Sequence, residues 1–167
     1  SVRRQRQMCI RDRGTSSSAA TIPVSLESTL KNGISKPVAS FVIPLCATIH
    51  LSGSMIKLTL YAFAIVYMAN LDISTGTGLG FIFLLGIMMI AAPGVPGGAV
   101  MVAAGLLADM MGFDDGMVAL MIAAYIAIDS VGTAANVTGD GAIAMIVDKF
   151  AGDKNDPSEE ESAEATA

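Results

Sequence analysis

A stripe of polar side chains inside an apolar segment is the strongest constraint on how this chain folds. Residues 117–147 are mostly apolar, but four polar residues stand at regular spacing among them: Asp129, Thr133, Asn136 and Asp140. Because they are 4, 3 and 4 residues apart, they share one face of a helix. Two carboxylates and an amide at membrane depth are costly unless something binds there. The stripe therefore predicts a binding site on a membrane-embedded helix.

The composition supports a membrane protein. Of 167 residues, 53% are hydrophobic and 15% are charged, and the mean hydropathy is +0.61. A chain this apolar is unlike an ordinary soluble domain. We expect a multi-pass protein of the cell membrane, in contact with the lipid bilayer.

The first thirteen residues differ from the rest. All five arginines lie in 1–13, and the segment looks like the translation of a sequencing-library adapter. We interpret it as non-native; the alternative is a basic juxtamembrane arm. The remainder begins abruptly at Gly14, so we expect the C-terminal part of a longer protein, with a disordered acidic tail over 151–167.

Two segments predict unusual helices. Residues 38–70 contain a single charge, Lys57, but 50–54 place an imidazole, two hydroxyls and a glycine at the centre. The alternatives are a helix broken at a cavity and a continuous helix. Residues 79–92 would reach only roughly 21 Å, against about 30 Å of hydrocarbon. With the Pro/Gly-rich 93–98 after them, they predict a re-entrant hairpin over 77–112, or else two short core helices of a soluble protein.

Four motifs in order resemble one family. They are Thr-Ser-Ser-Ser-Ala-Ala-Thr-Ile-Pro at 15–23, Pro-Leu-Cys-Ala-Thr-Ile at 44–49, Gly-Val-Pro-Gly at 94–97 and Asn-Val-Thr-Gly-Asp at 136–140. Together they resemble the dicarboxylate/amino-acid:cation symporters, the glutamate-transporter homologues. The resemblance covers 14–150 and implies an all-α integral membrane fold, part of an elevator-type transport domain. Its parts are the second arm of a first hairpin (14–35), a broken helix (38–70), a re-entrant hairpin (77–112) and a long last helix (116–150).

The resemblance also implies a role for particular residues. Asp129 would hold a substrate ammonium as a charge-assisted pair. The other implied substrate contacts are Ser17, Ser18, Ser54, Val95, Gly97, Gly132, Thr133 and Asn136. A deep sodium site would use Asn136, Asp140 and the Cys46 carbonyl, close to His50. A second would use the carbonyls of Thr48, Met89, Ile90 and Ala92.

The chain departs from the family pattern at the central break. Residues 50–54 read His-Leu-Ser-Gly-Ser where the family usually reads Asn-Met-Asp-Gly-Thr. The missing Asp leaves the cation count open. His50 either couples protons, because imidazole titrates near neutral pH, or is a hydrogen-bonded packing residue. Lys57 either replaces a lost cation electrostatically or snorkels toward water.

A third departure bears on the substrate. Acidic-substrate members place an arginine where this chain has Gly132, or in the first hairpin at the position of Ser16, and no arginine follows Arg13. A second buried carboxylate would lack its partner. We therefore predict a symporter that couples Na⁺, H⁺ or both to uptake of a small neutral amino acid. The alternatives are a C4-dicarboxylate or acidic amino acid symporter, an ion channel using the same polar core, and a fragment inactive without its scaffold.

The same resemblance sets the remaining expectations. At full length we expect a homotrimer, whose contacts lie in scaffold helices outside this segment. We expect no enzymatic activity, no organic cofactor and no nucleic-acid partner.

Overall fold

The computed structural model describes residues 17–151, and within that range every regular element is an α-helix. The helices are α2 (Ile22–Lys31), α3 (Lys36–Ile49), α4 (Ser52–Met68), α5 (Thr75–Met89), α6 (Gly98–Met111), α7 (Asp115–Ala127) and α8 (Asp129–Ala151). The all-α prediction is confirmed. The segment 1–13, the start of the predicted first-hairpin arm over 14–16, and the tail over 152–167 lie outside the described residues.

The chain is interrupted between α3 and α4, at the polar residues of the predicted break. His50 and Leu51 leave helical geometry, with φ/ψ of −106°/86° and −110°/44°. Taken together, Lys36–Met68 is 33 residues long with a mean hydropathy of 1.5. It is the one helical stretch in residues 17–151 that is long and apolar enough to cross a membrane by itself.

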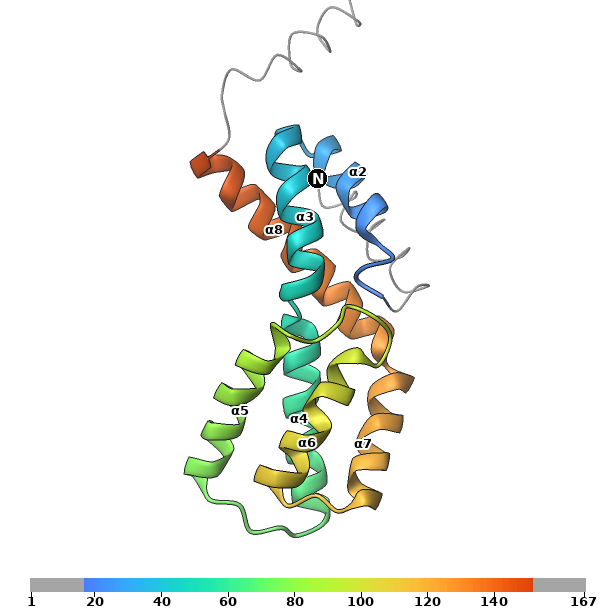
Figure 1. Cartoon of the computed structure of the whole chain (residues 1–167), viewed down its shortest axis with the longest axis vertical. Coiled ribbons are helices and arrows are strands. Elements are labelled where there is room, and N and C mark those ends of the chain that lie inside the picture. The colour runs from blue at the N-terminus through green and yellow to red at the C-terminus, as the bar shows by residue number, and fades with distance from the viewer. Residues whose placement is uncertain (1–16, 152–167) are drawn as a thin grey trace, which may run out of the picture.

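Helices α5 and α6 lie side by side and meet in a Pro/Gly-rich tip over 90–97 (Figure 1). They contain 15 and 14 residues, so each reaches roughly 22 Å. Ser74 caps α5 by accepting a hydrogen bond from the Thr77 amide, at 3.1 Å. The helix therefore begins at Thr75, before the hairpin predicted over 77–112. Gly97, at φ 73°, turns the chain into α6 in a conformation that favours glycine.

The last segment departs from the single helix predicted over 116–150. Helices α7 and α8 are bent by 63° at Ile128. No proline or glycine marks this bend, so the apolar pattern alone could not locate it. Asp129 becomes the first residue of α8, where the helix dipole favours a carboxylate. The four-residue stripe still lies on one helix, and all four side chains are buried.

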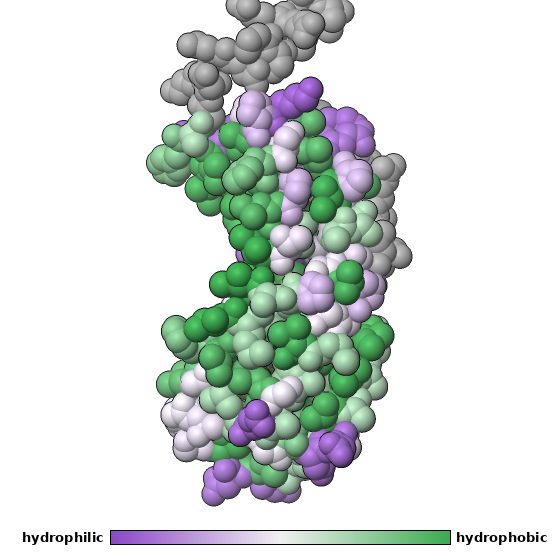
Figure 2. All heavy atoms as spheres, viewed as in Figure 1, coloured by the Kyte–Doolittle hydropathy of each residue, from purple (hydrophilic) through white to green (hydrophobic). Residues whose placement is uncertain are grey.

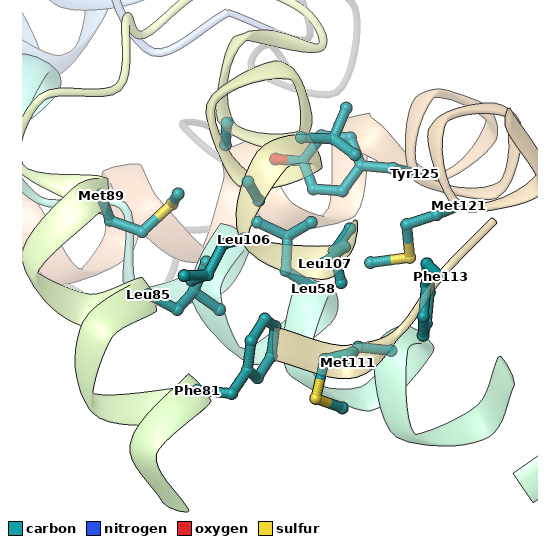
Figure 3. Packing of buried hydrophobic residues seen from close by; sticks show 14 of the residues in the cluster. Leu58, Phe81, Leu85, Met89, Leu106, Leu107, Met111, Phe113, Met121 and Tyr125 are labelled. Atoms are coloured by element: carbon teal, nitrogen blue, oxygen red, sulfur yellow. The ribbon is translucent and has the colours of Figure 1, made fainter. Parts of the chain in front are cut away.

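Two apolar cores lie at opposite ends of the molecule. The larger lies among α4, α5, α6 and α7, and Figure 3 shows its side chains, including Leu58, Phe81 and Leu107, packed together. The smaller joins α2, α3 and α8 through residues such as Val42 and Ile43. The helix breaks and the hairpin tip fall between them, at mid-height in Figure 1. This arrangement leaves a polar layer across the middle of the fold.

The outer surface is largely apolar. Figure 2 shows hydrophobic residues over most of one face, with hydrophilic residues toward the ends of the long axis. Large exposed apolar side chains include Phe41, Leu60, Tyr67, Phe83 and Met101. Such a surface suits contact with lipid or with further helices rather than with water.

Candidate functional site

A small pocket opens in the polar layer. Its cavity volume is about 10 Å³, which is room for about one water molecule. Helices α4, α6, α7 and α8 meet around it with two loop tips, residues 17–21 before α2 and residues 90–97 between α5 and α6. Its lining is Ser18, Leu51, Ser54, Pro93, Gly94, Val95, Ala99, Tyr125, Asp129, Thr133 and Asn136.

Asn136 joins α8 to the start of α4. Its Oδ1 accepts hydrogen bonds from the Gly53 amide at 2.8 Å and the Ser54 amide at 3.4 Å, and its Nδ2 donates to Ser54 Oγ at 3.2 Å. The first amides of a helix have no partner within the helix. Asn136 therefore acts as the cap that α4 lacks in its own sequence, and it fixes the broken helix against the stripe.

Asp129 is 5% exposed and both of its carboxylate oxygens are engaged. Oδ1 accepts a hydrogen bond from Lys57 Nζ at 2.9 Å, and Oδ2 accepts one from the Gly97 amide at 3.0 Å. This one carboxylate links α8 to α4 and to the hairpin tip. Each oxygen keeps a second lone pair, so Asp129 can still accept from a ligand in the pocket.

Lys57 does not snorkel, which corrects one of the two sequence interpretations. The residue is 9% exposed, and its Nζ also donates to the carbonyls of Tyr125 at 3.2 Å and Ile128 at 3.4 Å. The Tyr125 ring lies beneath it, with its centroid 3.5 Å from Nζ. Sequence reasoning missed this pairing. The helical spacing of Lys57, three residues after Ser54, was the available signal for a shared face.

At the far side of the layer, Asp140 pairs with His50. His50 Nδ1 lies 2.8 Å from Asp140 Oδ1, and the carboxylate is almost fully buried. Close packing holds this contact, because a Cβ added at Gly139 would lie 2.4 Å from the His50 ring. His50 is thus a direct partner of the carboxylate predicted for the deep sodium site.

The two loop tips touch each other. Ser17 Oγ donates to the Gly94 carbonyl at 2.9 Å, and the Ala19 amide donates to the same oxygen at 3.2 Å. A Cβ at Gly94 would lie 2.6 Å from the Ala47 carbonyl, so a side chain there would force the tip away from α3. The tips form one side of the pocket.

The residues predicted for the second sodium site lie at the ends of α3 and α5. The Met89 carbonyl already accepts a hydrogen bond from the Ala92 amide, at 3.3 Å, and Thr48 Oγ1 donates to the Leu45 carbonyl. Ile90 is exposed, whereas Met89 and Ala92 are buried. Cys46, predicted for the deep site, gives its carbonyl to the His50 amide at 2.8 Å. Both cation sites stay predictions.

The pocket brings together most of the predicted substrate contacts. Ser18, Ser54, Val95, Asp129, Thr133 and Asn136 line it. Ser17 and Gly97 do not line the pocket, but each forms a hydrogen bond with a residue that does, Gly94 and Asp129 respectively. Gly132 does not line the pocket, and a Cβ added to it would point toward Lys57. Sequence reasoning missed Tyr125, which lies four residues before Asp129, on α7, and also lines the pocket.

The chain is similar in sequence to known amino acid transporters. Excitatory amino acid transporter 1 of Rattus norvegicus is 32% identical over 136 residues, covering 81% of this chain and 25% of the relative. Neutral amino acid transporter B(0) of Mus musculus is 29% identical over 154 residues, covering 88% of this chain and 27% of the relative. The chain thus spans about a quarter of the length of these relatives.

A family profile also matches most of the chain. The profile of the sodium:dicarboxylate symporter family matches residues 3–150. The match begins inside the segment 1–13, so the interpretation of that segment as non-native gains no support from it. The chain belongs to the sodium:dicarboxylate symporter family.

Proposed function

We propose that the protein containing this chain is a secondary active symporter, which uses cation gradients to take up a small amino acid. The observation that carries the proposal is the pocket between the broken elements. Carboxylate, amide and hydroxyl groups from Asp129, Asn136 and Ser54 converge there with a hairpin tip. Secondary transporters build midplane sites from such discontinuous helices. Family membership supports the same reading.

Sodium is the proposed coupling ion. Asp140 is a buried member of the stripe, one turn of helix after Asn136. Hard oxygen ligands from Asn136, Asp140 and the Cys46 carbonyl suit an alkali cation. The His50 contact adds a second element. Because His50 Nδ1 lies 2.8 Å from Asp140 Oδ1, a proton on the imidazole would compete with a cation at this carboxylate. We therefore propose Na⁺ coupling with H⁺ as an alternative or additional coupled ion.

A small neutral amino acid is the proposed substrate. Among the described residues, no lysine or arginine lines the pocket, so a second substrate carboxylate would meet no cation there. Lys57 stands behind Asp129 and Tyr125, and its three N–H donors already meet three oxygens. A substrate ammonium would use the free lone pairs of Asp129, and its carboxylate would use Ser18, Thr133 and the tip amides. An acidic amino acid or a C4-dicarboxylate is the alternative.

The same family relationship supports a proposal about the full-length protein. We propose an elevator-like movement of the transport domain, in which the tip over 90–97 is the gate and Val95 and Gly97 are its substrate contacts. The apolar outer surface supports a multi-pass protein of the cell membrane, with scaffold helices of a homotrimer against part of that surface.

A ligand screen of the full-length protein tests the substrate. We expect serine, threonine or alanine to raise the unfolding midpoint in detergent when Na⁺ is present, with a much smaller rise in its absence. The same amino acids should accumulate in proteoliposomes when Na⁺ is present outside and absent inside. Stabilisation by aspartate or C4-dicarboxylates alone would overturn the neutral assignment. Ion current without saturable uptake would instead support a channel.

Substitution at Gly132 tests how acidic substrates are excluded. A Cβ at Gly132 would lie 3.3 Å from Lys57 Nζ, so Gly132→Arg alone brings two cations together and should gain no aspartate affinity. Combining Gly132→Arg with Lys57→Ala removes the repulsion and leaves a guanidinium beside the pocket. We expect that pair to bind aspartate at least about tenfold more tightly than the unmodified protein, by calorimetric titration. A gain in the single variant would contradict the repulsion.

A further inference from the structure

The ammonium of Lys57 sits in a shell built as a cation site. Three oxygens surround it: Asp129 Oδ1 at 2.9 Å, the Tyr125 carbonyl at 3.2 Å and the Ile128 carbonyl at 3.4 Å. The Tyr125 ring closes a fourth side, its centroid at 3.5 Å. An ammonium has three N–H donors, so this shell satisfies it completely.

The shell exists because α7 ends where it does. At the end of a helix the last carbonyls have no amide partner within the helix, and the helix dipole places partial negative charge there. The 63° bend at Ile128 turns α8 away and leaves the carbonyls of Tyr125 and Ile128 facing one point. The Ile128 carbonyl also accepts a hydrogen bond from the Val131 amide, at 3.2 Å. Asp129 adds a full negative charge at the start of α8. The ends of half-helices coordinate small cations in this way in transporters.

We propose that this shell is a monovalent-cation site of the transport core, distinct from both predicted sodium sites, and that Lys57 fills it as a tethered cation. The side chain reaches the site from α4, so the cation belongs to the protein and cannot dissociate. Cutting the side chain back would leave a site for a free monovalent cation of similar size, such as K⁺ or methylammonium.

The charges facing the site support a single bound cation. Asp129 is the one ionised side chain that contacts Lys57 Nζ among the described residues, and the remaining contacts are carbonyl dipoles and a π face. Asp140 is paired elsewhere, with His50. The pocket wall therefore stays neutral with or without substrate. The protein would need one free cation fewer than a core in which Asp129 had no tethered partner.

The test is a cation titration of full-length variants without any amino acid, so its outcome does not depend on the transport assignment. Lys57→Ala and unmodified protein are held in N-methyl-D-glucamine chloride, and K⁺ or methylammonium replaces that cation at constant ionic strength. We expect Lys57→Ala to unfold on the order of 5 to 10 °C lower, because a buried carboxylate loses its partner. Small cations should restore at least half of that loss with a saturating dependence, and should shift the unmodified midpoint by only about 1 °C.

Two further variants make the result specific. Lys57→Met fills the space with an apolar chain, so it should lose stability without recovering in either cation. Lys36→Ala removes an exposed lysine at the start of α3 and should behave as the unmodified protein. The proposal is overturned if Lys57→Ala gains no cation dependence, or if Lys57→Met recovers equally. If Lys57→Ala gives no folded protein, Lys57→Ser, whose short side chain also leaves the space open, is titrated in the same way, and absence of recovery there has the same meaning.

Discussion

Replacing Asp129 with asparagine should reduce amino acid uptake by at least about a hundredfold, because the pocket loses the carboxylate that would hold the substrate ammonium. The same change should destabilise the protein by about 3 to 5 kcal/mol, since Lys57 keeps its charge in a buried position without a counter-charge. The asparagine NH₂ would also face the Gly97 amide, so one donor would meet another. Uptake into proteoliposomes and chemical unfolding measure the two effects separately.

A double variant separates the two consequences of that change. Asp129→Asn together with Lys57→Met removes both charges, so most of the lost stability should return. Uptake should stay at background, because nothing replaces the carboxylate. Sodium should still stabilise the double variant, since Asp140 and His50 do not contact this pair. Uptake that returned with stability would remove Asp129 from substrate binding.

Features that depend only on neighbouring residues could be predicted from the sequence. Pro/Gly composition over 93–98 and hydroxyl-rich composition over 50–54 fall where the structure has its hairpin tip and its helix break. Proline and glycine disfavour helices by their own backbone chemistry, wherever the chain folds. The stripe was readable for the same reason, because helical spacing alone places its members on one face.

The bend at Ile128 and the position of Lys57 could not be predicted from the sequence. The two features are linked, because the Lys57 side chain binds the helix end at the bend. Neither feature has a local sequence cause. The carbonyls released at the end of α7 find a partner in the Lys57 ammonium, which comes from 71 residues earlier in the chain. A bend that is stabilised by a distant side chain needs no proline or glycine at its own position. Sequence reasoning therefore extended the helix through Ile128 and treated Lys57 as a separate, surface-seeking charge.

Helices α4 and α8 approach each other closely at Gly53, so a substitution there should have a large effect on stability. A Cβ added at Gly53 would lie 2.6 Å from the Gly132 carbonyl oxygen and 2.6 Å from Ala135 Cβ. Both neighbours belong to the α8 backbone or sit directly on it, so neither rotates away. Gly53→Ala should force the two helices apart and destabilise the protein by about 1 to 3 kcal/mol, with loss of the 2.8 Å bond between the Gly53 amide and Asn136.

Gly105→Ala is the matched control. Gly105 lies within α6, and a Cβ there would meet nothing within 4 Å. Alanine should stabilise that helix by roughly 0.5 to 1 kcal/mol, so the same substitution has opposite signs at the two positions. Denaturant unfolding measures the sign of the stability change at each glycine. Uptake should fall only in Gly53→Ala, because the displaced helices carry Asn136 and Ser54, which line the pocket. Equal stability changes at the two glycines would mean that α4 and α8 are not in backbone contact at the break, and the pocket would lose the wall on which substrate and ion binding depend.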